Sequence, residues 1–131
     1  MKLEVLSQLF CVCRLESNSN IPNWLFQSYF YTITKTNDEL SLVCEQKLVP
    51  LGIKAERDFV VLKVLGPLDF SLTGILSSIA KPLSEGGISI FAISSFDTDY
   101  ILVRKFDIKA TLEILNKNRF TIIQPNQIEK T

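Results

Sequence analysis

The chain has 131 residues, 47% of them hydrophobic, and its 14 acidic side chains balance its 14 lysines and arginines. A disordered chain would be far more polar, so this composition predicts one compact body or two small ones that share a core. The balance of charge excludes a general attraction to phosphate backbones or anionic lipid, and we expect neither a nucleic-acid nor a membrane partner.

The first fifteen residues form an apolar run that contains Glu4, Ser7, Gln8 and Arg14. These polar residues interrupt both a signal-peptide core and a membrane span, so we expect a cytoplasmic protein. The chain has three cysteines, and an odd number without an export signal fits reduced thiols better than a disulfide framework.

A strand with one apolar face is predicted near the start, where Leu9, Cys11, Cys13 and Leu15 fall on alternate positions. Cys11 and Cys13 then point the same way. A closed thiolate site normally needs four ligands, and Cys44 adds only a third. We therefore expect this thiol face to be buried and free of metal.

An internal repeat is the most informative pattern in the chain. The segment ITKTNDELSLVC, Ile33–Cys44, matches ISSFDTDYILVR, Ile93–Arg104, without a gap at an offset of 60 residues, and pairs Glu39 with Asp99. Each segment ends one apolar run, crosses a short turn with acidic residues and begins a second run, as a β-hairpin does. The repeat predicts two similar hairpins packed into one body with pseudo-symmetry.

The first half contains few residues besides its hairpin. A loop at Ser17–Asn20 is followed by Pro22, which suits the first position of a short helix to about Gln27. The segment from about Glu45 to Asp58 is the expected junction between the halves. Trp24 is expected in the core or between the halves.

The second half has a clearer order of elements. A buried strand, FVVLKVL, precedes a helix that is expected to kink near Lys81 because of Pro82, and to stop at Gly86. A hairpin, a helix capped by Asp107 and a closing strand, FTII, follow. The apolar stripe of the first helix comprises Leu72, Ile75, Leu76, Ile79, Ala80 and Leu83.

This strand–helix–strand–strand–helix–strand order is the βαββαβ pattern of ferredoxin-like folds, an α+β sandwich. The first half repeats the order imperfectly, since its first helix must be shortened and its second reduced to a turn. We therefore predict two tandem ferredoxin-like domains, a degenerate one at residues 1–58 and a complete one at residues 59–131.

The run from Gly66 to Asp107 and the segment YTITKTNDELSLVC resemble the small tandem ACT-domain proteins, regulatory modules that generally bind amino acids. The first of these runs is also distantly similar to the last ACT domain of the cytosolic arginine sensors of animal cells. That resemblance implies that Asp99 contacts a ligand and that a loop at Leu68–Gly74 closes around it. Leu72 stands where those sensors have an acidic residue, and Asp97 and Thr98 replace their Asn and Phe.

An amino-acid site has a chemistry that these residues can supply. The first N–H groups of a helix lack intrahelical acceptors and can receive a carboxylate, while Asp99 or Asp97 in the hairpin turn can accept an ammonium group. Gly74 would let the ligand approach the backbone. The candidate ligand-binding residues are Asp69, Phe70, Ser71, Leu72, Thr73, Gly74, Ser95, Phe96, Asp97, Thr98 and Asp99.

Each of these residues also has a structural interpretation. Asp69 and Ser71 suit helix caps, Asp97 and Asp99 suit a turn, and Gly74 suits a close approach of helix and strand. Phe96, in the same turn, is expected to anchor the loop.

Catalysis has little support, because the chain has no histidine, no phosphate-binding Gly-rich loop and no dinucleotide fingerprint. We expect no catalytic residue and no cofactor. Three functions remain: an amino-acid sensor, an interaction module whose ligand site has decayed, or an RNA-binding domain, which would need exposed aromatic and basic residues on the central strands. Exposed edge strands favour a homodimer.

Overall fold

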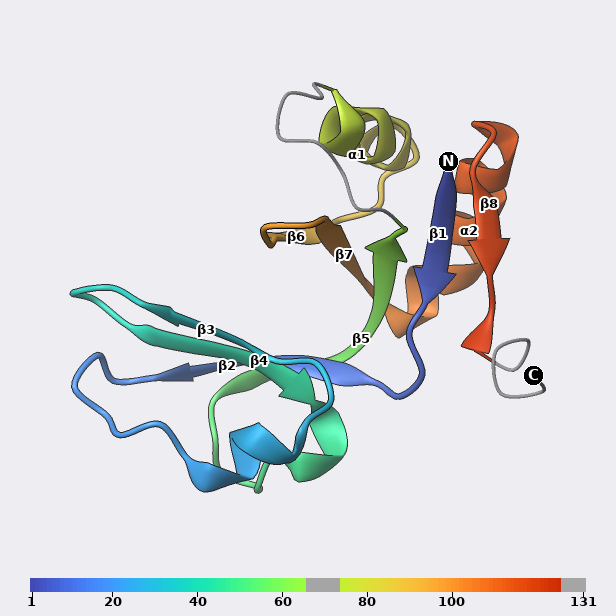
Figure 1. Cartoon of the computed structure of the whole chain (residues 1–131). Coiled ribbons are helices and arrows are strands. Elements are labelled where there is room, and N and C mark those ends of the chain that lie inside the picture. The colour runs from blue at the N-terminus through green and yellow to red at the C-terminus, as the bar shows by residue number, and fades with distance from the viewer. Residues whose placement is uncertain (66–73, 126–131) are drawn as a thin grey trace. The chain divides into compact units, whose positions relative to one another are not determined.

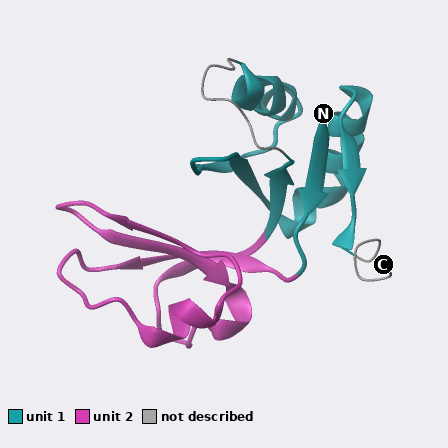
Figure 2. Cartoon of the chain, viewed as in Figure 1, with its two compact units in different colours: residues 1–7, 60–131 teal, residues 8–59 magenta. Residues whose placement is uncertain are grey.

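The computed structural model describes residues 1–65 and 74–125 and divides the chain into two compact units (Figure 2). Unit 2 is the continuous segment Gln8–Phe59, whereas unit 1 combines Met1–Ser7 with Val60–Thr131. The expected boundary after residue 58 thus lies one residue from the observed division. The first seven residues, however, belong with the C-terminal part of the chain.

Unit 1 is an α+β unit in which one strand comes from the N-terminus (Figure 1). Its sheet has the order β6-β7-β5-β1-β8, where β1 is antiparallel to β5 and parallel to β8. The elements are β1 (Lys2–Val5), the second half of β5 (Ala55–Val64), α1 (Ile75–Glu85), β6 (Phe91–Ser94), β7 (Asp99–Arg104), the short 3₁₀ helix η3 (Lys105–Asp107), α2 (Ile108–Lys117) and β8 (Thr121–Ile123).

Strand β1 was missing from the predicted elements. Leu3 is paired with Val64 of β5 and with Ile122 of β8. The side chain of Leu3 is fully buried, and the side chain of Val5 is almost fully buried. Lys2 and Glu4 alternate with these apolar residues. This alternation is a strand pattern. It was available in the sequence but was interpreted only as a break in an apolar run.

The two helices of unit 1 pack against each other, and α2 also contacts β7 and β8. Ile79 and Leu83 are the buried members of the predicted apolar stripe of α1. Pro82 lies inside this helix, and Gly86 is its C-cap. Asp107 occupies the N-cap position of α2 as expected, but its side chain makes no capping hydrogen bond.

Unit 2 repeats the strand order of unit 1 without an inserted strand. Its sheet runs β3-β4-β2-β5, and all neighbouring strands are antiparallel. The 3₁₀ helices η1 and η2 stand where a ferredoxin-like unit has its two α-helices, so the predicted degenerate copy is confirmed. Its elements are β2 (Phe10–Leu15), η1 (Asn23–Gln27), β3 (Thr32–Lys35), β4 (Leu40–Glu45), η2 (Gln46–Leu48) and the first half of β5.

The core of unit 2 lies on the η-helix side of these strands and contains the thiols as well as aliphatic side chains. Trp24 and Ala55 are partly buried against it, so Trp24 is a core-lining residue of this unit. The buried members are Cys11, Cys13, Leu25, Leu40, Leu42, Cys44 and Val49.

Candidate functional site

The turn between β6 and β7 is the centre of the candidate site in unit 1. Ser94 and Asp99 face each other as the last pair of the hairpin, which leaves a four-residue turn, 95–98. The backbone N–H of Ser95 donates to the carbonyl oxygen of Thr98 at 2.8 Å, and the N–H of Thr98 donates to the hydroxyl of Ser95 at 3.3 Å. These bonds give the turn a defined shape.

Thr98 fixes this turn to the end of β5. Its side-chain hydroxyl donates to the carbonyl oxygen of Val64 at 2.5 Å, and the residue is only 5% exposed. Val64 is the last residue of β5, and the chain leaves this strand toward α1. The structure therefore brings the hairpin turn of residues 95–98 to the strand end from which the helix connection starts.

Asp99 lies half-buried at the base of the turn, where one oxygen of its carboxylate accepts a hydrogen bond from the hydroxyl of Ser94 at 2.6 Å. Ser94 was not among the predicted site residues, although its place opposite Asp99 follows from the hairpin register. Asp97 is exposed, and Phe96 is 79% exposed, so Phe96 does not anchor the loop in a core as expected. One carboxylate is thus held in place and a second is free to face solvent.

The start of α1 differs from the expected one. Gly74 is the N-cap with φ 80°, and the first helical residue is Ile75. The first helical hydrogen bond runs from the N–H of Ser78 to the carbonyl oxygen of Gly74, so the N–H groups without intrahelical acceptors are those of residues 74–77. A Cβ added at Gly74 would lie 3.8 Å from the Ser77 hydroxyl, so the left-handed backbone, not a close strand, accounts for this glycine.

Five of the predicted site residues lie outside the described residues. The helix-cap and ligand-loop expectations for these positions therefore stay predictions. They are Asp69, Phe70, Ser71, Leu72 and Thr73.

The hairpin of unit 2 has the same turn but a different residue at the key position. Thr36 and Glu39 bond as Ser95 and Thr98 do, with the N–H of Thr36 donating to the carbonyl oxygen of Glu39 at 2.9 Å. The structural offset is therefore 59 residues, and the gapless match at 60 is wrong by one. The counterpart of Asp99 is Leu40, which is 2% exposed, so unit 2 has no equivalent carboxylate.

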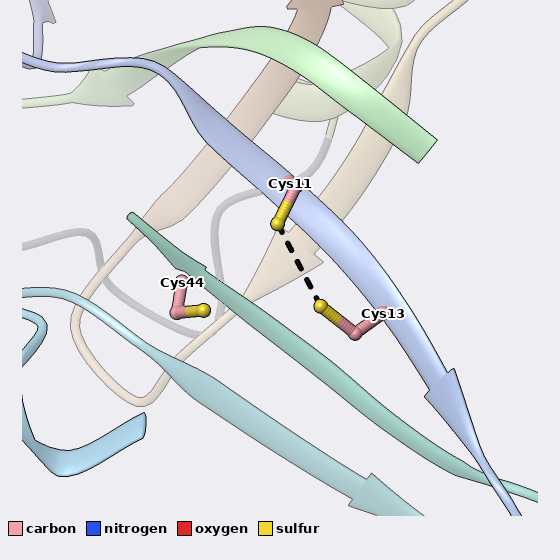
Figure 3. Close-up of side chains that lie close together, drawn as sticks. All are labelled: Cys11, Cys13 and Cys44. Carbon is pink, nitrogen blue, oxygen red and sulfur yellow. Dashed lines mark hydrogen bonds between the residues drawn. The ribbon is translucent and has the colours of Figure 1, made fainter. Parts of the chain in front are cut away.

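A second cluster of reactive side chains lies in unit 2. Cys11 and Cys13 project from the same face of β2, and Cys44 faces them from β4 (Figure 3). The sulfur atoms of Cys11 and Cys13 are 3.6 Å apart, and all three sulfurs lie within 4.8 Å of one another. The three thiols are at most 1% exposed and form no disulfide. Their burial was predicted; the closeness of Cys44 was not, although the hairpin pattern places it on the core face.

Within residues 1–65 and 74–125, the helices are too short or too polar to cross a membrane.

Comparison with known proteins identifies the units of the chain. A family model described as ACT domain matches residues 54–117, and a second model, of an N-terminal domain, matches residues 8–51. The crystal structure of the protein Atu0741 from Agrobacterium tumefaciens is 36% identical, with a TM-score of 0.89, and the match covers 94% of this chain and 92% of that one.

Two further similarities are more distant. The bovine cytosolic arginine sensor for mTORC1 subunit 1 is 29% identical over 97 residues, which are 66% of this chain but only 30% of the sensor. Aspartate kinase from Clostridium acetobutylicum shares the fold at 18% identity, with a TM-score of 0.63 over 86% of this chain and 33% of that chain. The family-model match to residues 54–117 and the relative that is 36% identical over nearly the whole chain show that the chain belongs to the ACT-domain family.

Proposed function

We propose that this protein is a non-catalytic regulatory protein that binds a small amino acid at the β6–β7 turn of unit 1. The hydrogen bond from Thr98 to Val64 is the observation that carries the proposal, because it holds the turn at the strand end that leads to α1. Residues 54–117 match an ACT domain, and the bovine relative is an arginine sensor. Both similarities support a regulatory role and an amino acid as the ligand class.

The two charged groups of an amino acid have suitable partners in unit 1. The carboxylate of Asp99 can accept bonds from a ligand ammonium group in addition to the one from Ser94, since an ionised carboxylate has about four lone-pair positions. The first N–H groups of α1, from Ile75 onward, suit the ligand carboxylate. Because Leu40 occupies the position of Asp99 in unit 2, we expect one site per chain.

A thermal-shift screen against the twenty amino acids tests the ligand class. An amino acid present at about 100 times its dissociation constant should stabilise the folded protein by about 2.7 kcal/mol. A raised midpoint with one or a few related amino acids is the expected result. A chain whose midpoint none of them moves would contradict the proposal and leave the protein as an interaction module.

Substitution of Asp99 by Asn tests the location of the site. The change keeps the size of the side chain but removes its charge, and the loss of a charge-assisted hydrogen bond should weaken binding about ten- to a hundredfold in isothermal titration calorimetry. Asp38→Asn, the same change in the equivalent turn of unit 2, is the matched control and should leave the affinity unchanged. Equal affinities of Asp99→Asn and the wild type would place the ligand elsewhere.

A homodimer stays a prediction. Among the described residues, β6 pairs only with β7, so one edge of this strand is unpaired, and Phe91 on it is 38% exposed. Sedimentation velocity over a range of protein concentrations tests this, and a monomer at all concentrations would contradict it.

A further inference from the structure

We propose that Cys11, Cys13 and Cys44 form a three-coordinate site for a soft monovalent metal ion, Cu(I), in the core of unit 2. This site is separate from the amino-acid site, and nothing in the proposed function requires it. It also replaces the expectation of a metal-free thiol face, which rested on the four ligands that a closed thiolate site normally needs.

The geometry of the three sulfur atoms matches a trigonal metal site. With metal–sulfur bonds of about 2.3 Å, three thiolates around one ion place their sulfurs about 4 Å apart. The distance from Cys11 to Cys13 is 3.6 Å, and all three sulfurs lie within 4.8 Å of one another. Strands β2 and β4 hold them there, because Cys11 and Cys44 are directly paired across the ladder.

The number and type of the ligands, three cysteine sulfurs, favour one metal ion over another. Thiolates prefer soft ions such as Cu(I) and also bind zinc. A closed zinc site normally has four ligands, and the group of metal-ligating side chains found in the described part of the chain consists of these three cysteines alone. The whole chain has no histidine to complete a tetrahedral site. Cu(I), which accepts a small number of sulfur ligands, fits a dry three-sulfur site better than Zn²⁺.

The charge of the loaded site is partly balanced within unit 2. Thiolates are the metal-binding form of cysteine, so when Cu(I) binds all three, three protons leave and two net negative charges remain. Arg57, on the first half of β5, interacts electrostatically with Cys11 and Cys13 and supplies one opposite charge.

Anaerobic titration of the reduced full chain with Cu(I), in competition with bathocuproine disulfonate, tests the site. We expect the protein to withdraw one Cu(I) per chain from the chelator. X-ray absorption of the loaded wild type should show three sulfur neighbours at about 2.3 Å. The proposal would be overturned if the copper stayed with the chelator, or if the spectrum showed fewer than three sulfur neighbours around the copper. Both measurements use the wild-type protein, so neither depends on a variant that folds.

Variants separate the geometry of the site from the number of thiols. Cys44→Ser should lower the Cu(I) affinity by at least about tenfold, which corresponds to 1.4 kcal/mol. Adding Val12→Cys to this variant restores three thiols, but Val12 lies on the opposite face of β2 and should not restore the affinity. Wild-type Cu(I) affinity in either variant would refute a site built from these three cysteines. Stoichiometric four-coordinate zinc in the wild-type protein, purified without chelator, would also refute it.

Discussion

Thr98 joins two parts of unit 1 through one side-chain atom. Its hydroxyl donates to the carbonyl oxygen of Val64 in a buried position, and its own backbone closes the hairpin turn with Ser95. A valine has nearly the same shape but no donor. The substitution therefore changes one hydrogen bond and very little packing.

We expect Thr98→Val to lower the free energy of unfolding by about 1–3 kcal/mol, because the buried carbonyl of Val64 loses its donor. Chemical denaturation measures this loss. Thr98→Ser keeps the hydroxyl and should retain most of the stability. If the serine variant were destabilised as much as the valine variant, the methyl group and not the hydrogen bond would be the important feature.

At the scale of elements, Gly86 lies at the end of α1, where a side chain would meet α2. A Cβ placed there would lie 2.5 Å from the terminal methyl carbon Cδ1 of Ile114 on α2. The φ of Gly86 is −82°, which any residue can adopt, so the backbone itself imposes no need for glycine. The close approach of the two helices explains this residue.

Gly86→Ala should destabilise the protein by about 0.5–1.5 kcal/mol, because the flexible end of the Ile114 side chain must turn aside to make room. In the background of Ile114→Val, which lacks the clashing carbon, the same change should cost less, with a coupling free energy of at least about 0.5 kcal/mol. Denaturation of the four members of this double-mutant cycle measures the coupling. Additive effects would mean that the two helices do not approach as closely as described.

The elements also show which parts of the fold and site the sequence could predict. Periodicity predicted β5, both hairpins and α2, because each has a long apolar pattern bounded by turn residues. It missed β1, because the polar residues that alternate with Leu3 and Val5 were interpreted only as a break in an apolar run. It misplaced the start of α1 because Gly74 has no side chain to mark a cap. Asp99 could be picked out in the turn, but its partner Ser94 required the register of the hairpin.

The repeat shows a further limit of sequence alone. The match of Glu39 to Asp99 maximised chemical similarity, whereas the hydrogen bonds of the two turns pair Leu40 with Asp99. A shift of one residue moves side chains to the opposite face of a strand. Only the geometry of the turns could therefore show that the two hairpins differ at this position.

At the scale of the whole molecule, unit 1 depends on a strand that is remote in sequence from the rest of that unit. Leu3 is fully buried between its partners on β5 and β8. We expect Leu3→Ala to lower the free energy of unfolding by about 2–5 kcal/mol, as for other buried leucines. Hydrogen exchange should become faster at the amides of β5 and β8 in unit 1.

Ile33→Ala is the matched control for this experiment, because Ile33 lies on β3 of unit 2 and is 39% exposed. Its effect should stay within about 0.5 kcal/mol. Equal losses for the two variants, or unchanged exchange at β8 in Leu3→Ala, would contradict the role of β1 as an interior strand of unit 1.

The position of β1 also bears on how the chain folds as the ribosome makes it. Unit 2 is continuous, so its strands can pair as soon as residues 8–59 have emerged. Strand β1 emerges earlier, but β8, its parallel neighbour, is synthesised more than one hundred residues later, and the N–H of Thr121 bonds to the carbonyl oxygen of Met1. At about 5–20 residues per second, the nascent β1 waits roughly 6–23 s for that partner. The thiol cluster would thus be assembled during translation, well before the sheet that carries the proposed amino-acid site is complete.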